Sequence, residues 1–576
     1  MIGLNKAIAE TFQQYASLLE IQGESPFRVR AYRNASDTMR NLTWDVKELI
    51  QQNKDLTELP AIGKDIAKKI EEFVKTGHLK DLDHVKKVFP ESLLELLEIQ
   101  GLGPKGVRKI YDTLHVSNLN QLQELAQKGG LSKVPGFGQK TQLKLMEEIN
   151  RKVESGKRYL LPAMEAKVEE LVKFIQLIPG VKKVTAAGSF RRRKATIGDL
   201  DLVVSCKRDS RVMDYFVKHG QVSEVLSKGP TRSAVRLNNG FQVDVRVVPE
   251  SSYGAALLYF TGSKSHNIAL RRIAQSQGKK INEYGLYQET KKLAGFTEKD
   301  IYKNLGLSFI EPELRENQGE IQAAQKGELP QLIQIKDIKG NLHAHTDASD
   351  GRHSLEDVAQ MAKEAGFEYF AITDHSKSLT VANGLDEKRL LQQMEAIDRL
   401  NETLDGIKIL KGIEVDILED GQLDLADDIL KKLDVCVASI HSHFNLDEEQ
   451  QTERLVRAMD NPYVHIIGHP TGRLLQKRES YSINIERLMD AAHDRNCYLE
   501  LNTQIKRLDL SDQHCRLAKE KGVKIAISTD AHRKDDFSSL RYGIDQARRA
   551  WLNPTDVINT RPWPELQKLL KRSDSF

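Results

Sequence analysis

The feature that most limits how this chain can fold is a rhythm in its last 240 residues. Seven β-rich runs alternate there with helical patterns, and each run ends in a residue that can bind a metal ion. The runs cover residues 340–345, 369–375, 409–414, 435–441, 465–469, 498–502 and 525–532. Strands that alternate with helices predict parallel β/α units, and a β/α barrel carries its active site at the carboxyl ends of the strands. A lone histidine is usually structural, but a set in this register predicts a metal site.

The charge of the chain is unevenly distributed. Its 576 residues are too many for one core and predict several domains. Residues 337–576 hold 33 Lys+Arg, 42 Asp+Glu and 11 of the 16 histidines, a net charge of −9, whereas residues 1–336 hold 53 and 40, a net charge of +13. A basic front half and an acidic, histidine-rich rear half predict a polyanion binder joined to a metal site. Scattered cysteines, and the lack of a membrane-length apolar run or signal peptide, predict a cytoplasmic protein.

A glycine-containing turn that leads into a helix occurs three times in the basic half. Gly63 belongs to the first copy, Gly101 and Gly103 to the second, and Gly136 and Gly138 to the third. Glycine lets backbone N–H groups at a helix N-terminus approach a phosphate, and such contacts hold a duplex without reading its sequence. Three copies predict nucleic-acid binding.

Residues 25–33 interleave cations with aromatic side chains, which suits phosphates and stacking but also an ordinary basic surface.

Two apolar runs place carboxylates on one face of a predicted sheet. Residues 188–204 begin with a Gly-Ser turn, pass through four basic residues and end in a strand that contains Asp199 and Asp201. Residues 241–248 alternate in the same way and supply Asp244. Residues two apart in a strand share a face, so the three acids converge and would repel one another without cations. Three acids beside a basic Gly-Ser turn suit an ion with oxygen ligands, Mg²⁺ in particular, which shares its ligands with substrate phosphates. Two such ions would allow displacement at phosphorus.

The front half resembles family X DNA polymerases of the polymerase beta type, within the nucleotidyltransferase superfamily. The resemblance covers about residues 1–315 and rests on GSFRRRKATIGDLD, VDVRVVP, YFTGS, INEY and the three turns, which resemble helix-hairpin-helix motifs. It implies catalysis by the three aspartates. It also implies nucleotide binding by a larger set: Gly188, Ser189, Arg192, Gly198, Tyr259, Phe260, Gly262, Asn267 and Arg271.

The first segment of the chain resembles the 5′-phosphate and deoxyribose-phosphate lyase domain of these polymerases. Arg28 and Tyr32 match phosphate contacts, and Lys69 matches the Schiff-base lysine, with Lys64 and Lys68 as neighbours able to lower its pKa. An ordinary surface lysine is the alternative for Lys69. The chain departs from the family pattern at three positions, where it has Asp65, Ala61 and Gln242 instead of a basic residue, a glycine and an arginine.

The rear half resembles the PHP (polymerase and histidinol phosphatase) domain. Matching that domain's motifs implies nine metal ligands, enough for about three ions: His343, His345, Asp350, His375, Glu414, His441, His469, Asp530 and His532. Mixed imidazole and carboxylate ligands favour Mn²⁺, Zn²⁺ or Fe²⁺ over Mg²⁺. Asp374, His443 and Asn502 are candidate supports for the ligands, and Arg473 is a candidate phosphate contact.

Together these features predict a multidomain α+β polymerase core fused to a C-terminal α/β PHP barrel of about seven β/α units. The expected domains are a lyase-like helical domain at 1–85, a helical DNA-binding subdomain at 86–150, an antiparallel palm with helices on one face at 151–250, a nascent-pair-binding subdomain at 251–315, a linker at 316–336 and the PHP domain at 337–576.

The predicted function is template-directed gap filling with a metal-dependent 3′-5′ exonuclease, and cleavage at abasic sites as a further option, in base excision repair. The expected ligands are gapped or primer-template DNA with a 5′-phosphate, dNTPs, Mg²⁺ in the polymerase, and Mn²⁺ or Zn²⁺ in the PHP site. The protein is expected to be a monomer. The alternatives are a template-independent nucleotidyltransferase, a small-molecule phosphatase in the rear half, and a PHP domain that is only structural.

Overall fold

The computed structural model describes residues 2–42, 46–97, 99, 101–138, 142–143, 145–146, 148–149, 157–206 and 210–572. The chain divides into two compact units, Met1–Lys157 and Arg158–Phe576. None of the described helices is long and apolar enough to cross a membrane. The predicted helix start at Gln139, Lys140 and Thr141 lies outside the described residues.

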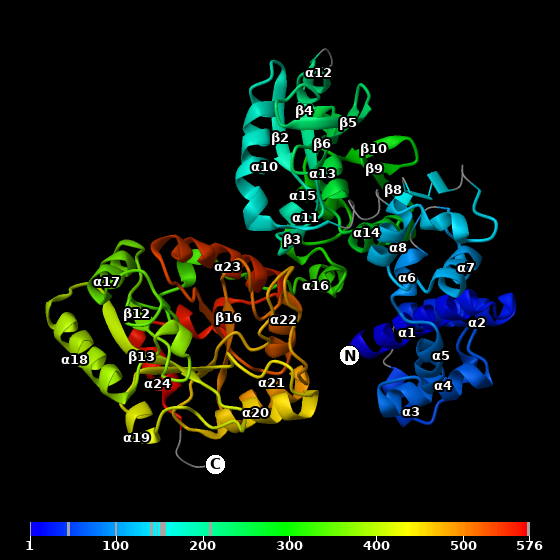
Figure 1. The fold of residues 1–576 in the computed structure, drawn as a ribbon. Helices are drawn as coiled ribbons and strands as arrows, with labels where there is room; N and C mark the ends of the chain where they lie inside the picture. The colour runs from blue at the N-terminus through cyan, green and yellow to red at the C-terminus, as the bar shows by residue number, and fades with distance from the viewer. Residues whose placement is uncertain are drawn as a thin grey trace. The chain divides into compact units, whose positions relative to one another are not determined.

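The first unit is helical (Figure 1). Its helices are α1 (Ile2–Gln22), α2 (Pro26–Asn41), α3 (Val46–Gln51), η1 (Leu56–Glu58), α4 (Lys64–Thr76), α5 (Lys80–Val88), α6 (Leu93–Leu96), α7 (Pro104–Leu114), α8 (Leu119–Gln127) and η2 (Gly130–Lys133). Gly63 and Gly103 cap α4 and α7 at their N-termini. Gly101 and Gly136 have φ near +89°, which L-residues rarely adopt.

Ala61 adopts the left-handed conformation that glycine provides in the other two turns, with φ +62°. A Cβ is disfavoured there by about 1 kcal/mol, so Ala61→Gly should stabilise this turn and slow amide hydrogen exchange in α4 about fivefold in the full-length protein. The matched control, Ala67→Gly inside α4, should speed that exchange because glycine weakens helices. Equal exchange in wild type and Ala61→Gly would contradict the prediction.

The second unit begins with a five-stranded sheet in the order β2-β4-β7-β6-β5. Its elements are β1 (Tyr159–Leu160), α10 (Leu161–Gln176), β2 (Val181–Ala186), α11 (Gly188–Arg191), β3 (Thr196–Ile197), β4 (Asp199–Cys206), α12 (Val212–Phe216), β5 (Val222–Lys228), β6 (Arg232–Leu237) and β7 (Gln242–Val248). The prediction of an antiparallel sheet is wrong at its centre, because β4 and β7 pair in parallel. One face of the sheet packs with α10 and α12, and the other packs with α13 (Tyr253–Thr261), so helices lie on both faces.

A small subdomain and the expected linker follow the sheet. They contain η3 (Glu250–Ser252), α14 (Lys264–Ser276), a three-stranded sheet, α15 (Glu298–Asn304), η4 (Pro312–Leu314), α16 (Glu320–Lys326) and η5 (Ile335–Asp337). The sheet consists of β8 (Lys279–Asn282), β9 (Gly285–Gln288) and β10 (Lys291–Ala294). Residues 316–336 are folded, in contrast to the linker that their polar composition predicted. Ile321 and Ala324 of α16 are buried in the core of this subdomain.

The rest of the chain forms a seven-stranded parallel sheet in sequential order, β11 to β17. The strands are β11 (Gly340–Asn341), β12 (Tyr369–Ile372), β13 (Lys408–Asp416), β14 (Val435–Ser439), β15 (Ile466–Ile467), β16 (Tyr498–Asn502) and β17 (Ile525–Ser528). A parallel bridge between Ala344 and Ala531 joins the segments after β11 and β17, so the sheet is a nearly closed barrel. The expectation of about seven β/α units in a PHP-type barrel is confirmed.

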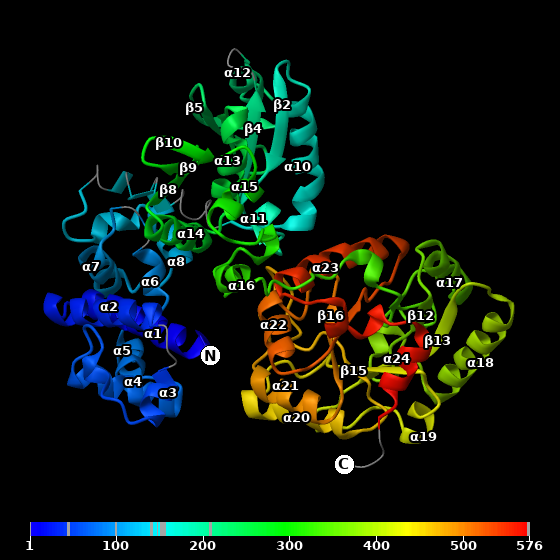
Figure 2. The same ribbon diagram turned by 180° about the vertical axis from the view of Figure 1, so that it is seen from behind.

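Helices surround this barrel (Figures 1 and 2). They are α17 (Leu355–Glu364), η6 (Thr380–Ala382), α18 (Glu387–Thr403), α19 (Asp427–Leu430), α20 (Glu448–Asp460), α21 (Ile485–Asp494), α22 (Asp512–Glu520), η7 (Lys534–Ser539), α23 (Leu540–Arg549), η8 (Pro554–Asp556), η9 (Ile558–Thr560) and α24 (Trp563–Leu570). Both faces of the strands are buried, as expected of parallel sheets.

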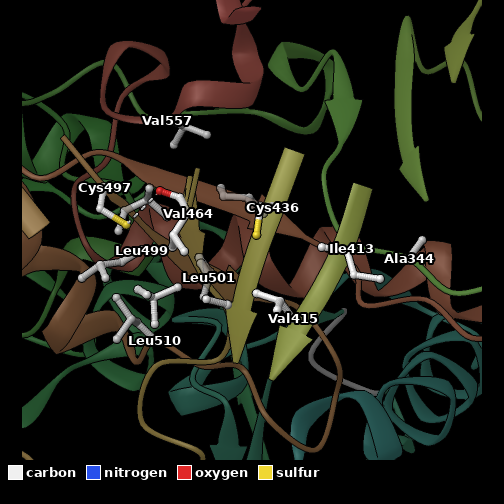
Figure 3. Packing of buried hydrophobic residues seen from close by; sticks show 14 of the residues in the cluster. Ala344, Ile413, Val415, Cys436, Val464, Cys497, Leu499, Leu501, Leu510 and Val557 are labelled. Carbon is white, nitrogen blue, oxygen red and sulfur yellow. Dashed lines mark hydrogen bonds between the residues drawn. The ribbon is translucent and has the colours of Figure 1, made fainter. Parts of the chain in front are cut away.

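The residues along each barrel strand alternate between two cores. Ile413, Val415, Leu499 and Leu501 pack with the outer helices (Figure 3). Leu410 and Tyr498 belong to a separate cluster that includes α24. Because residues two apart share a face, Glu414 points the same way as Leu410. The inward face is therefore apolar at the start of a strand and polar at its carboxyl end.

Candidate functional site

Two groups of polar residues stand out in the second unit, and the first lies on β4 and β7. The parallel register pairs Asp201 with Asp244 and Asp199 with Gln242. Leu200 and Leu202 point into the core, so the acids share the opposite face. Burial, followed by the charges of Asp199 and Asp244, raises the pKa of Asp201 to about 7. This crowding of acids favours either a proton or a cation between them.

The Gly-Ser turn lies against this carboxylate pair. Gly188 has φ +60°, and a Cβ at that position would stand 3.1 Å from Asp201 Oδ2. The Ala187 N–H donates to the Asp201 carbonyl over 2.8 Å. Only glycine therefore fits so close to the acids. This contact places Ser189 and the basic loop that follows directly beside Asp201.

Asp244 has two partners of its own. Gln242 Nε2 donates to its Oδ2 over 2.7 Å, and Arg232 of β6 lies 3.2 Å from its Oδ1. Sequence reasoning left open which group would fill the role of the arginine expected at position 242, and it missed Arg232. The pairing of Ala234 with Asp244 across β6 and β7 brings Arg232 to the same face as Asp244, and the sequence alone does not report this register. Arg232 supplies the positive charge from the neighbouring strand.

The residues predicted to bind the nucleotide come from separate segments that the fold brings together. Gly262 has φ +68°, and a Cβ there would lie 3.2 Å from an Arg192 guanidinium nitrogen. Arg192 also donates to the Thr261 carbonyl. Asn267 Nδ2 donates to the Tyr259 carbonyl over 2.7 Å. A small cavity is lined by Tyr259, Asn267, Arg271 and Asn282. Gly198 lies at the other end of the loop, facing Arg158.

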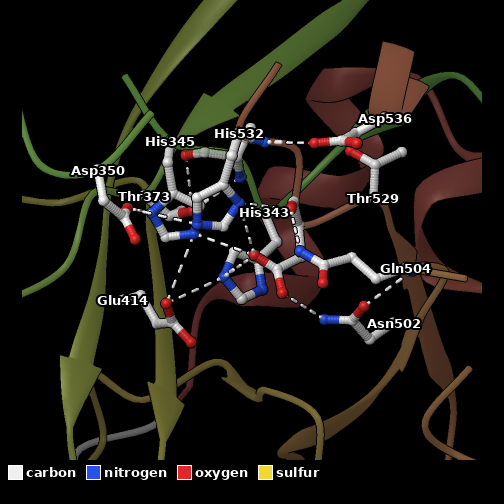
Figure 4. A network of polar contacts seen from close by, with 12 residues as sticks. His343, His345, Asp350, Thr373, Glu414, Asn502, Gln504, Thr529, His532 and Asp536 are labelled. Atoms are coloured by element: carbon white, nitrogen blue, oxygen red, sulfur yellow. Dashed lines mark hydrogen bonds and ion pairs between the residues drawn. The ribbon is translucent and has the colours of Figure 1, made fainter. Parts of the chain in front are cut away.

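The second group lies at the carboxyl ends of the barrel strands and contains all nine predicted ligands. Figure 4 shows five of them, His343, His345, Asp350, Glu414 and His532. Glu414 lies at its centre, with one or other carboxylate oxygen 2.9 to 3.5 Å from nitrogens of five histidines: His343, His345, His375, His441 and His469. Asp350 and Asp530 bridge His345 to its neighbours, with Asp530 Oδ1 3.1 Å from His345 Nε2 and Asp350 Oδ1 3.3 Å from His532 Nε2.

Three sets of side chains in this group have ligand atoms within 4.8 Å of one another. The sets are His345, Asp350, His375 and His532; His343, His345 and Asp530; and His375, Glu414 and His441. Among the described residues all such sets lie in this barrel, so the palm carboxylates are more widely spaced. The buried atoms His343 Nε2, His345 Nδ1, His375 Nδ1 and Glu414 Oε2 form no hydrogen bond of acceptable geometry, although Glu414 Oε2 lies 2.9 Å from His375 Nδ1 and 3.3 Å from His343 Nε2. Buried polar atoms are normally satisfied, so these unsatisfied nitrogen and oxygen atoms fit divalent metal ions.

The electrostatics of the group match this interpretation. Burial lowers the pKa of His345 to about 3, with help from His532 and His375. Burial acts the same way on His441, but Glu414 and Asp416 outweigh it and raise the pKa to about 9. The pKa of Glu414 lies well below its usual value, because His343, His375 and His441 outweigh the effect of burial. Glu414 is therefore ionised, as a metal ligand must be, and an ion at His441 would have to displace the proton that its raised pKa retains.

Two acids that orient ligands were missed by sequence reasoning. Glu500 Oε1 lies 2.8 Å from His343 Nδ1, and Asp416 Oδ1 lies 3.1 Å from His441 Nδ1. Both follow the two-residue period of their strands, which was the available signal. Such contacts fix the ring orientation of metal-binding histidines. Asn502 Nδ2 donates to Asp530 over 2.9 Å, as expected of a support.

The other two expected supports and the candidate phosphate contact lie differently. His443 faces Glu419 at the surface, 3.7 Å away. Asp374 accepts from the backbone and hydroxyl of Thr346 and from Ser349, so it holds the loop before Asp350 rather than a ligand itself. Arg473 donates to the carbonyls of Arg507 and Leu508. It is Arg507 that reaches the site, with Nε 3.8 Å from Asp530.

In the first unit, the predicted lyase and phosphate residues have protein partners. Lys69 Nζ contacts the Asp81 carboxylate, with 11% of the lysine side chain exposed, whereas Lys64 and Lys68 are exposed. A Schiff-base lysine must present its amine to the aldehyde, and here the amine is occupied by the Asp81 carboxylate. Tyr32 is buried and its hydroxyl donates to Asp65 over 3.3 Å. Arg28 is partly exposed beside Glu24.

Comparison with known proteins identifies the family. Family models match at residues 3–79 (helix-hairpin-helix domain), 93–151 (SAM-like helix-hairpin-helix tandem), 256–316 (DNA polymerase beta thumb) and 341–504 (PHP domain). The DNA polymerase/3′-5′ exonuclease PolX of Bacillus subtilis is 36% identical over 573 residues, 99% of this chain and 100% of that protein. The chain belongs to the PolX family. The resemblance to family X polymerases with a C-terminal PHP domain is thereby confirmed.

Other relatives of this PolX-family chain match one half only. DNA polymerase lambda of Rattus norvegicus is 27% identical over 347 residues, 54% of this chain and 56% of that protein. A probable phosphatase of Thermoanaerobacter sp. is 33% identical over 232 residues, 38% of this chain and 90% of that protein. The probable phosphatase is therefore about as long as one half of the PolX architecture.

Proposed function

We propose that this protein is a template-directed, gap-filling DNA polymerase that also removes 3′ nucleotides with its PHP domain, as a repair enzyme. The observation that carries the polymerase half is the in-register placement of Asp201 beside Asp244, with Gly188 packed against Asp201. The full-length match to a polymerase/exonuclease of Bacillus subtilis supports both halves. Primer extension on a gapped duplex, compared with an unpaired strand, tests it, and equal extension of both would favour the template-independent alternative.

In the polymerase half, Asp199, Asp201 and Asp244 would hold divalent ions, with Mg²⁺ as the proposed metal. Such ions supply charge stabilisation at phosphorus and help to activate the 3′-hydroxyl. Ser189 and Arg192 would bind the triphosphate from the loop beside Asp201, and Gly198 lies where this loop enters β4. Tyr259, Phe260 and Gly262 would lie against the sugar of the dNTP. Asn267 and Arg271 would face the nascent base pair.

In the PHP half, the nine converging side chains would hold about three ions, with Mn²⁺ or Zn²⁺ proposed because imidazole and carboxylate ligands mix. Bound ions there supply a hydrolytic nucleophile and polarise a phosphate. The four buried ligand atoms without a hydrogen-bond partner support ion binding in this barrel. Digestion of 3′-labelled DNA by the metal-loaded protein, with and without chelation, tests this half. A metal-loaded protein that does not digest the DNA would favour the structural alternative.

In the first unit, Gly63, Gly101, Gly103, Gly136 and Gly138 would bring backbone N–H groups to the phosphates of gapped DNA. Arg28 would contact the 5′-phosphate, and Tyr32 would do so only by leaving Asp65. Lys69 stays the predicted lyase nucleophile, and it would have to separate from Asp81 to attack an aldehyde. We propose that the protein acts as a cytoplasmic monomer with the domain boundaries given above, except that the segment around α16 belongs to the nascent-pair-binding subdomain instead of a linker.

The pocket that contains the PHP cluster has features that suit a DNA end. Its volume is about 1010 Å³, and its lining includes Arg352, Lys506, Arg507 and Arg533. Basic side chains around a metal centre attract a polyanion. The polymerase palm contributes Leu160, Pro162 and Ala163 to the same lining. The match to the probable phosphatase of Thermoanaerobacter sp. covers 90% of that protein but only 38% of this chain. These three palm residues, which we call the palm edge, are therefore specific to the fused architecture.

This palm edge should influence DNA more than small substrates. Ala163 is exposed on α10, so Ala163→Glu places a negative charge at the pocket without disturbing the core. We expect about tenfold slower digestion of 3′-labelled DNA, because a carboxylate repels phosphates, and unchanged hydrolysis of bis(p-nitrophenyl) phosphate. Ala163→Lys, the matched control, should retain DNA digestion. Equal loss in both variants would indicate a steric effect and contradict the prediction.

A further inference from the structure

The basic loop predicted to bind the triphosphate is held by helix α23 of the PHP domain. Arg193, the residue after Arg192, pairs with Asp545 at 2.6 Å and with Glu165 of α10 at 3.0 Å. Gln546 Nε2 donates to the Arg193 carbonyl over 3.2 Å. Arg549 donates to the Arg192 carbonyl over 2.7 Å. Three residues on two consecutive turns of one PHP helix thus reach a loop of the polymerase half.

Glu316 links this helix to the side chain of Arg192. Its Oε1 lies 3.0 Å from Arg192 Nε, 3.2 Å from Arg549 and 3.6 Å from Lys194 Nζ. The three charged side chains in closest contact are nearly buried, with exposed fractions of 12% for Arg192, 14% for Glu316 and 6% for Arg549. Burial acts to raise the pKa of Glu316, but Arg192, Arg549 and Lys194 outweigh it and lower the pKa, so this carboxylate is ionised.

An ionised Glu316 opposes nucleotide binding in two ways. It attracts the guanidinium that the triphosphate needs, and it repels the phosphates themselves. Arg549 reduces both effects, because it supplies a second guanidinium to the same carboxylate oxygen. Arg549 is itself fixed by Asp512 of α22, at 2.8 and 2.9 Å. Arg549 is therefore oriented by the PHP domain and acts on Arg192 through the carboxylate they share.

We infer that Arg549 of the PHP domain is a positioning residue for dNTP binding in the polymerase half. By sharing the charge of Glu316 and holding the Arg192 carbonyl, it leaves the Arg192 side chain available to a triphosphate. This inference rests on the proposed role of Arg192. It adds that the nuclease domain contributes to the affinity of the polymerase for its nucleotide substrate.

The test compares steady-state gap filling in full-length variants. Arg549→Met removes the charge and keeps the length, and it should raise the KM for dNTP about tenfold while kcat changes less than twofold. Arg549→Lys should restore most of the affinity. Adding Glu316→Gln to Arg549→Met should also restore it, which a merely structural role for Arg549 would not produce. Arg548→Met is the matched control, because Arg548 pairs with Glu313 instead and should leave the KM for dNTP unchanged.

Two further variants complete the test. Glu316→Gln alone should lower the KM for dNTP about threefold, and this variant tests the role of the shared carboxylate if Arg549→Met does not fold. Unchanged KM values in both variants would overturn the inference. Arg192→Gln tests the underlying proposal separately, since it should raise the KM for dNTP by itself. If Arg192→Gln raises the KM and the Arg549 and Glu316 variants do not, only the role of Arg549 fails.

Discussion

Asp201→Asn should leave a folded protein that extends primers at least about 10³-fold more slowly than wild type. Asparagine keeps the shape of the side chain but removes the charge that holds cations between β4 and β7, and such charge stabilisation contributes several kcal/mol to the transition state. Single-nucleotide gap filling under saturating dNTP measures the loss. Exonuclease activity should persist, because the PHP ligands are a separate set of side chains.

Asp214→Asn is the matched control for this experiment. Asp214 is a surface acid of the same sheet domain, paired with Lys228 at 2.6 Å and Arg211 at 3.3 Å, and 40% exposed. Surface pairs of this kind contribute little, so gap filling should be unchanged. Wild-type rates in Asp201→Asn, or a comparable loss in Asp214→Asn, would remove Asp201 from the proposed site.

The same residue predicts how the metal requirement depends on pH. Burial and two neighbouring acids raise the pKa of Asp201 to about 7, so in the metal-free protein it is protonated below that pH and ionised above it. A cation must displace this proton. The apparent affinity for Mg²⁺ should therefore fall about tenfold per pH unit below pH 7 and level off above it. Titrating gap filling with Mg²⁺ between pH 5.5 and 8.5 measures this affinity. An affinity that does not change with pH would contradict the prediction.

Glu414→Gln should reduce digestion of 3′-labelled DNA by at least about 10³-fold, with little effect on gap filling. Glu414 contacts five histidines with its two oxygens, so the amide removes a ligand and the negative charge that balances the others. Loss of a metal that generates the nucleophile costs several kcal/mol. Metal analysis of the purified variant should show less bound metal per chain than wild type.

The control for this variant is Glu419→Gln. Glu419 follows the same strand but is 63% exposed and faces His443, 3.7 Å away, at the surface. It should keep both the metal content and the nuclease activity. Undiminished metal content in Glu414→Gln would contradict the assignment of Glu414 as a shared ligand.

The barrel and its site were largely predictable because both follow local periods. Eight of the nine ligands lie at the ends of β-rich runs, and only Asp350 comes from a loop. The same two-residue period places Asp416 beyond Glu414 on β13 and Glu500 on β16, and both of these acids were overlooked. The strand direction of β7 was not predictable in this way. Alternation reports which face a residue occupies but not which neighbour the strand pairs with, since parallel and antiparallel partners give the same pattern.

Composition was a poor guide where charges are buried in pairs. Residues 316–336 look like a linker because they are polar, yet Glu320 is fully buried against His266 at 2.7 Å. Arg473 looked like a phosphate contact for the same reason, although its guanidinium binds backbone carbonyls. Pairing between residues far apart in sequence decides both cases, and no short-range pattern reports it.

The folded segment at 316–336 has a consequence for how this architecture can be divided. Glu320 accepts hydrogen bonds from the backbone of Asn317 and Gln318 besides its contact with His266, and Ile333 N–H donates to the Leu552 carbonyl. A truncation ahead of this stretch would leave His266 enclosed without its acid, at a cost of a few kcal/mol. The polymerase half therefore cannot be separated from the nuclease half at this point without a loss of stability. A shortened enzyme would have to repack its interior around His266.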